Sequence, residues 1–122
     1  MVKVAIIEDD QSISQMYLMK FELEGYKVET AENGKLGLEL VKKMRPDIIL
    51  LDLMMPEMNG DEMLEKLRQT DWGKNIKVAV LTNVGEEEIP KSLQKLGVSA
   101  VIMKAEMTPR QVADLVKQQL QK

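Results

Sequence analysis

The sequence predicts an α/β fold with a parallel, doubly wound sheet, and three observations support this class. Short apolar runs recur at residues 4–7, 48–51, 78–81 and 100–103, and they are continuous rather than alternating, as in strands buried on both faces. Stretches with helical periodicity fill the intervals between the runs. The resulting order, strand then helix repeated five times, favours parallel strands joined by right-handed crossovers.

The N-terminal half is expected to contain two strand–helix units. After the first apolar run, the spacing of apolar residues predicts one face of a helix, formed by Ile13, Met16, Tyr17 and Phe21. Gly25 would end this helix. The second strand, 27–31, is more polar, but Val28 and Thr30 favour an extended chain. The second helix presents Leu36, Leu40, Val41 and Met44, and it must end before Pro46.

The C-terminal half is expected to contain three more units. The strand at 48–51 precedes a third helix, whose buried face consists of Met63, Leu64 and Leu67. The fourth helix presents Ile89, Leu93 and Leu96, with Pro90 in its first turn and Gly97 after its end. The fifth helix begins at the N-cap residue Thr108, followed by Pro109 at the first helical position. Its buried face is predicted to be Val112, Leu115, Val116 and Leu120.

Length and composition narrow the class of protein. A chain of 122 residues fits a single domain, predicted here to span 1–122. The net charge of −3 argues against direct nucleic-acid binding. The absence of Cys and His excludes disulfides, thiol chemistry and the usual zinc ligands. The apolar runs are too short to span a membrane, so we expect a cytoplasmic protein.

Five polar residues follow the apolar runs at the point where each strand should end. These are Glu8, Asp9, Asp52, Thr82 and Lys104. Ligands bind beyond the carboxyl ends of the strands in sheets of this kind. Three carboxylates brought together there would resist ionising at once unless a cation offsets them, and oxygen-only ligands suit Mg²⁺. Each residue taken singly has an ordinary explanation as a solvated loop charge or a cap, but their joint placement favours a site.

The motifs around these residues resemble those of a two-component response regulator receiver domain. The segments that carry the resemblance, in order along the chain, are 7–10 (Ile-Glu-Asp-Asp), 51–56 (Leu-Asp-Leu-Met-Met-Pro), 59–60 (Asn-Gly), 81–82 (Leu-Thr) and 103–104 (Met-Lys). Each motif is weak alone, whereas all of them in order are specific. The resemblance covers essentially the whole chain and implies a flavodoxin-like fold, with strand order 2-1-3-4-5, five helices and three αβα layers.

The resemblance also implies a role for each residue of the site. Asp52 resembles the aspartate that accepts a phosphoryl group from a phospho-histidine kinase. Asp9, Asp52 and the backbone carbonyl of Met54 resemble the direct Mg²⁺ ligands, and Glu8 resembles the acid that holds the ion through a water. Asp10 resembles the variable position after the acidic pair. Elementary chemistry agrees, because a carboxylate is a competent nucleophile toward phosphorus if nearby positive charge offsets that of the phosphoryl group.

Two further residues complete the implied site, and the family suggests the partners. Thr82 resembles the hydroxyl that contacts the phosphoryl oxygen, and Lys104 resembles the lysine that pairs with the aspartate or its phosphoryl group. The expected donor is a sensor histidine kinase or a phosphotransfer protein. The expected output surface is the face of the fourth helix, fifth strand and fifth helix, in a monomer or weak dimer. The protein would assist only its own phosphorylation and dephosphorylation, so it is not predicted to be an enzyme.

Three residues depart from the family pattern. Asn83 stands where a small residue is usual, and it is expected to narrow access to Asp52. Ala105 stands where proline commonly follows a cis peptide; a non-proline cis bond costs ~3 kcal/mol, so a trans peptide is expected, with an uncertain position for Lys104. Val101 replaces the usual Tyr or Phe and cannot make the inward aromatic swing. These departures leave open an alternative function, a degenerate receiver that acts as a constitutive protein-interaction module.

Two apolar residues near the site predict that a phosphoryl group on Asp52 is lost slowly. Met54 lies two residues after Asp52, and Val84 lies two after Thr82. Neither side chain can orient an attacking water by hydrogen bonding, so the phosphorylated Asp52 is expected to decay slowly.

A third hypothesis, a phosphohydrolase of the haloacid dehalogenase type, fits less well. Those enzymes place the nucleophile on the first strand with a second Asp two residues later.

Overall fold

The computed structural model describes residues 1–55, 58–83 and 92–122, and it contains a five-stranded parallel sheet. The strands are β1 (Lys3–Ile7), β2 (Lys27–Ala31), β3 (Ile48–Asp52), β4 (Lys77–Thr82) and β5 (Ala100–Met103). Their order, β2-β1-β3-β4-β5, confirms the expected topology. Two strands are longer than predicted at their carboxyl ends, because Asp52 and Thr82 are the last residues of β3 and β4 and do not follow them.

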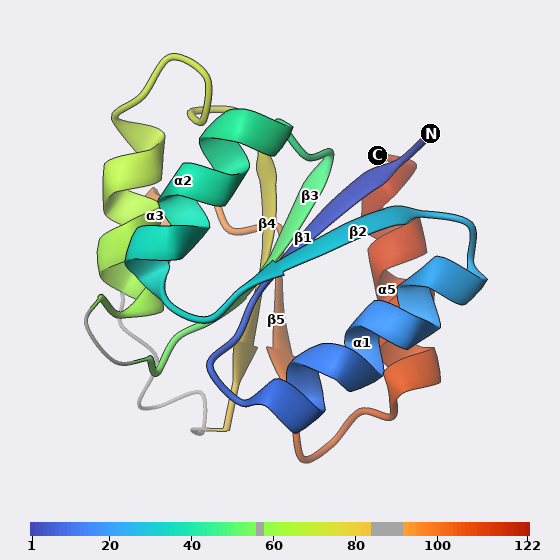
Figure 1. Cartoon of the computed structure of the whole chain (residues 1–122). Helices are drawn as coiled ribbons and strands as arrows, with labels where there is room; N and C mark the ends of the chain where they lie inside the picture. Colours follow the sequence, from blue (N-terminus) through green and yellow to red (C-terminus); the bar gives the residue numbers. More distant parts are fainter. Residues whose placement is uncertain (56–57, 84–91) are drawn as a thin grey trace.

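Helices cover both faces of this sheet and complete the three predicted layers (Figure 1). They are α1 (Gln11–Leu23), α2 (Gly34–Met44), α3 (Gly60–Arg68), α4 (Ser92–Lys95) and α5 (Pro109–Leu120). The ribbon shows α1 and α5 against one face, and α2 and α3 against the other. None of the helices in the described part of the chain is long and apolar enough to cross a membrane.

Two apolar clusters, one on each face of the sheet, explain why the strand sequences are continuously apolar. Ile7, Leu51 and Val80 point into the cluster shared with α2, α3 and Leu93 of α4. Their chain neighbours Ile6 and Leu50 point into the cluster shared with α1 and α5. Alternate residues of each strand are therefore buried on opposite faces of the sheet. In the central strands, polar residues are expected only at the strand ends.

The faces of the first two helices differ from the prediction. Met16 and Leu36 are each 40% exposed, although periodicity placed both in the core. In α1 the buried residues are Ser14, Tyr17 and Phe21, so the helix contacts the sheet along a narrower stripe that includes a small polar residue. A serine was not expected there, since hydrophobic periodicity cannot identify a buried hydroxyl. The predicted face of α3 is confirmed. In α5, Val112 and Val116 are buried, whereas Leu115 and Leu120 are partly buried; Ile89 and Pro90 lie outside the described residues.

The helix ends follow the sequence signals. Gly25, after α1, has a φ of +89° and Gly97, after α4, has a φ of +69°, values that glycine adopts without strain. The Thr108 side chain accepts a hydrogen bond from the Gln111 backbone N–H, and the Gln111 side chain accepts one from the Thr108 N–H, forming the capping box of α5. Of these three signals, the capping box of α5 lies at the carboxyl ends of the strands, where the polar residues gather, whereas both glycines turn the chain at the opposite end of the sheet.

Candidate functional site

The three acids of the N-terminal and central motifs meet at the carboxyl edge of the sheet. The parallel register pairs Ile7 with Leu51, which places Glu8, the residue after β1, beside Asp52 at the end of β3. Glu8 is 1% exposed and Asp52 is 4% exposed, whereas Asp9 lies on the surface. One carboxylate oxygen from each of the three lies within 4.8 Å of the others. The proximity expected from strand ends is therefore present.

Lys104 reaches this cluster from the end of β5. Its Nζ lies 2.8 Å and 3.0 Å from the two carboxylate oxygens of Glu8, and 3.5 Å from Oδ1 of Asp52. Its backbone N–H donates to the Thr82 carbonyl at 2.9 Å, which fixes β5 beside β4 at this edge. All peptide bonds of the described residues are trans, as expected for Ala105. A trans peptide thus still delivers the ammonium group, but its shorter contacts are with Glu8 rather than Asp52.

Burial and like charge make Asp52 hard to ionise. Desolvation, the hydrogen bond with Glu8 and the negative charge of Glu8 together raise the pKa of Asp52 to about 8. Lys104 and the Met54 backbone N–H oppose this rise. For Lys104, burial works to lower the pKa, but Glu8 and Asp52 hold the pKa above its ordinary value. One ammonium cannot neutralise all three acids once they are ionised, so a further positive charge at the site would favour the ionised form of Asp52.

The donor set fits a hard divalent cation. Carboxylate oxygens are the ligands Mg²⁺ prefers, and its octahedral shell of ~2.1 Å bonds places ligand atoms up to about 4.2 Å apart. The observed spacing of up to 4.8 Å needs only a small adjustment, and the exposed Asp9 has room to make it. Glu8, Asp9 and Asp52 would hold the ion. The Met54 carbonyl, expected as a further ligand, stays a prediction.

The loop after β3 is built tightly around the Asp52 backbone. The Met54 N–H donates to Oδ1 of Asp52 at 3.2 Å, and the Gly60 N–H donates to the Leu53 carbonyl at 3.0 Å. A Cβ at Gly60 would overlap the Asp52 carbonyl oxygen, so this position needs glycine for close approach rather than for an unusual φ. The Met54 side chain is 64% exposed beside the site. Pro56 lies outside the described residues.

The positions that depart from the family pattern lie on the surface around the site. Thr82 is fully buried at the end of β4, and Asn83 immediately after it is exposed. Val101 is 42% exposed on β5, where no aromatic ring is present to move inward. Val84 lies outside the described residues. Thr82 is thus buried beside the acidic cluster, while the departures lie at exposed positions.

Several roles were assigned incompletely from sequence. Asp10 caps α1, accepting a hydrogen bond from the Ile13 N–H at 3.1 Å, which explains why the third acid of the row stays outside the site. Tyr17 is buried close enough to feel the charges of Lys104 and Glu8, and burial raises its pKa. Its i, i+4 spacing with Phe21 predicted burial but not this neighbourhood.

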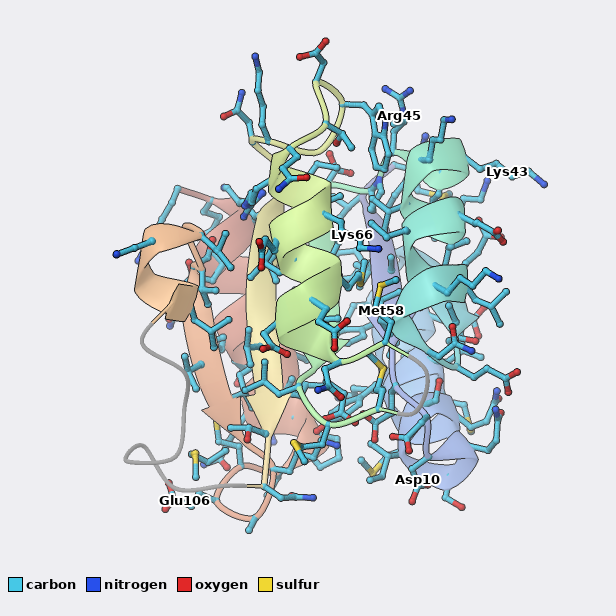
Figure 2. All side chains as sticks on the ribbon, turned by 90° about the vertical axis from the view of Figure 1, so that its left-hand side faces the viewer. Asp10, Lys43, Arg45, Met58, Lys66 and Glu106 are labelled. Carbon is cyan, nitrogen blue, oxygen red and sulfur yellow. The ribbon has the colours of Figure 1, made fainter. Side chains whose placement is uncertain are left out.

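Trp72 lies away from the acids. The Arg45 guanidinium sits 5.5 Å from the centroid of its ring, and Figure 2 shows Arg45 at the end of the molecule opposite to Asp10. Trp72 therefore takes no part in the acidic cluster.

The fold and the acidic edge together define a class of protein. A family model described as the response regulator receiver domain matches residues 4–117. The chain belongs to this family, as its motifs predicted. Receiver domains act in two-component signalling, typically as non-enzymatic modules that partner histidine kinases or phosphotransferases. The acidic cluster described above is consistent with the phospho-acceptor site of such a domain.

Particular relatives resemble the chain to different extents. It is 36% identical over 95 residues to sporulation initiation phosphotransferase F of Bacillus subtilis, covering 78% of this chain and 75% of that protein. It is also 36% identical over 86 residues to the DNA-binding dual master transcriptional regulator RpaA of Synechocystis, but spans only 36% of its length. The solved structure of Vibrio cholerae chemotaxis protein CheY4 superposes with a TM-score of 0.89 at 29% identity, over 97% of this chain and 98% of that chain.

Proposed function

We propose that the chain, as a single receiver domain over residues 1–122, accepts a phosphoryl group on Asp52 in a Mg²⁺-dependent reaction. The observation that carries the proposal is the grouping of buried Asp52 with Glu8, Asp9 and Lys104 at one sheet edge. A buried acid cluster of this kind costs stability, so a chemical role accounts for it better than a structural one. The donor would be a sensor histidine kinase or a phosphotransfer protein.

The residues divide the chemistry between them. An Asp52 carboxylate oxygen attacks phosphorus, a P–O bond forms, and the P–N bond to the donor imidazole breaks with its electron pair leaving on nitrogen. When bound, Mg²⁺ would offset charge on the phosphoryl oxygens. Lys104 lies within 3.5 Å of Asp52 and would turn to the phosphoryl group once it is attached, where the ammonium would offset its negative charge. Thr82, at the end of the adjacent β4, would contact a phosphoryl oxygen.

Incubation with acetyl phosphate tests the proposal. With Mg²⁺, intact-mass spectrometry should show the addition of one phosphoryl group, and with EDTA it should show none. Asp9→Asn should lower the extent of phosphorylation because it removes an exposed ligand without disturbing the buried pair. Asp10→Asn is the matched control, since asparagine caps a helix as well as aspartate does. Equal phosphorylation with and without Mg²⁺ would contradict the assignment of the metal.

A second function, the constitutive interaction module, is favoured by the departures from the family pattern at Asn83, Val101 and Ala105, all of which are exposed. In that case acetyl phosphate would leave the mass unchanged, and Asp52→Asn would bind partners as wild type does. If phosphorylation occurs, the proposed output face is formed by α4, β5 and α5, and a downstream protein would bind there. The chain itself would be a monomer or a weak dimer. Hydrolysis of added phosphate esters would instead support the haloacid dehalogenase type of chemistry.

Slow loss of the phosphoryl group is the expected consequence of Met54. Its exposed thioether cannot orient water, so the phosphorylated protein should persist in Mg²⁺ for minutes or longer, whereas Met54→Asn should shorten its lifetime several-fold. The decay of the phosphorylated mass after removal of donor measures this. Met19→Asn is the matched control, because Met19 on α1 is also 64% exposed. A wild-type half-life of seconds would refute the prediction.

A further inference from the structure

A concave surface lies at the amino ends of the strands, at the opposite end of the sheet from the acids. It is a pocket of about 430 Å³, between the C-terminal end of α3, the start of β4 and the C-terminal end of α4. That volume is within the range of small-molecule sites, roughly 300–1,000 Å³. Its walls include Arg68, Ile76, Lys77 and Leu96. The proposed phosphorylation chemistry uses none of these residues.

The charge of this pocket is opposite to that of the chain as a whole. Its nine lining residues include four cations, Arg68, Lys74, Lys77 and Lys95, and no acid, although the chain carries a net charge of −3. Among the residues that the structure describes, none of the four forms a salt bridge with an Asp or Glu side chain within 4.0 Å. Like charges gathered around one cavity repel each other, and an anion between them would relieve that repulsion.

Arg68 prepares the pocket rather than serving as its main ligand. Its Nε donates to the Leu96 carbonyl at 2.6 Å, and its terminal nitrogens donate to the carbonyls of Gly73, Ile76 and Gly97 at 2.9, 2.7 and 3.2 Å. Those carbonyl oxygens would otherwise repel an anion. With its planar fork already occupied, Arg68 cannot make a bidentate contact with a carboxylate, although it keeps its charge.

The lysines decide the chemistry of the ligand. Lys77 Nζ already donates to the carbonyls of Gln119 and Lys122, at 2.6 and 2.7 Å, so it is partly committed to the end of α5. Lys74 and Lys95 are exposed at the rim of the pocket, and their ammonium groups act as compact point charges. Point charges suit phosphate oxygens, which need no planar partner. Two rim lysines match a group with more than one negative centre.

We infer that this pocket binds a small molecule bearing a diphosphate group, held mainly by Lys74 and Lys95 above a floor formed by Ile76 and Leu96. Because Leu96 follows α4 and is tied to Arg68, an occupied pocket would hold the end of α4 against α3. The site is independent of the proposed function, since it lies at the other edge of the sheet and contains none of the phosphorylation residues.

Isothermal titration calorimetry of the full chain with sodium pyrophosphate, in Mg²⁺-free buffer at about 150 mM salt, tests this inference. Wild type should bind with a dissociation constant below about 1 mM. The double variant Lys74→Gln/Lys95→Gln should bind at least about tenfold more weakly. The matched control is Lys42→Gln/Lys43→Gln, which removes the same charge from two exposed lysines of α2, and it should bind as wild type does. Circular dichroism verifies that all variants are folded.

Three results would overturn the inference. The first is no binding to wild type, and the second is an equal loss in both double variants, which would indicate a response to net charge alone. The third is binding of citrate as tightly as pyrophosphate, which would indicate a general attraction for anions. Weaker binding of orthophosphate than of pyrophosphate, together with the loss confined to Lys74→Gln/Lys95→Gln, would support the diphosphate assignment.

Discussion

Asp52→Asn should make the metal-free protein more stable while abolishing its phosphorylation. Asparagine removes a charge from the most crowded point of the acidic cluster and keeps the shape of the side chain and its carbonyl oxygen for the Met54 N–H. A gain of roughly 1–3 kcal/mol in the free energy of unfolding is expected near pH 8 from the relief of repulsion and desolvation. The loss of phosphorylation should be complete, because the amide oxygen is not a competent nucleophile.

The raised pKa of Asp52 determines how the stability difference between the wild type and Asp52→Asn changes with pH. The folded protein holds a proton on Asp52 up to about pH 8, whereas the unfolded chain releases it near 3.8. The folded state therefore binds more protons between these values, and wild-type stability should fall as pH rises through this range. The stabilities of the wild type and Asp52→Asn should differ least at about pH 4, and the advantage of the variant should grow as the pH rises to about 8 and then level off.

Urea denaturation in EDTA across this pH range measures the effect, with Asp10→Asn as the control because that cap is exposed and asparagine preserves it. Saturating Mg²⁺ should reverse the order, since it binds the native wild type and stabilises it by mass action. A stability difference that does not change with pH would contradict the assigned pKa of Asp52.

The sequence was sufficient for the topology because the topology depends on features that a linear pattern records. The continuous apolarity of 48–51 and 78–81 required burial on both faces, and the polar residues after them required the edge of a sheet. Parallel strands bring Glu8 and Asp52 to the same edge of the sheet, and the strand order implied by the family resemblance makes β1 and β3 neighbours. The presence of a site was therefore predictable from the residue pattern together with that resemblance.

The internal pairing of the site was not predictable in the same way. Whether Lys104 lies nearer to Glu8 or to Asp52 is a difference of less than 1 Å, which no sequence pattern records. The burial of Ser14 in place of Met16 is likewise invisible to hydrophobic periodicity, which places apolar residues in the core. The basic pocket was also missed, since Arg68, Lys74 and Lys95 carry no motif and come together only through the fold.

Lys104→Met should be the most destabilising single change at the site. The Lys104 side chain is 10% exposed and that of Glu8 is 1% exposed, so the contact between them is nearly dry. Methionine keeps the length and apolar stem of lysine but leaves two buried carboxyls without their cation. Breaking a buried pair from one side costs about 3–5 kcal/mol, and protonation of the acids will recover part of this at low pH. The expected net loss near pH 8 is about 3 kcal/mol.

A double-mutant cycle separates the charge effect from packing. Adding Glu8→Gln to Lys104→Met should restore most of the lost stability, because the remaining Asp52 then has no buried charged neighbour to oppose it. Lys77→Met is the control, since that lysine donates to main-chain oxygens of Gln119 and Lys122 rather than to a buried side-chain carboxylate, and the variant should lose about 1 kcal/mol. Additive losses from Lys104→Met and Glu8→Gln would show that the 2.8 Å contact contributes no coupling energy. Lysine would then serve the reaction at this position without being needed to hold the acids together.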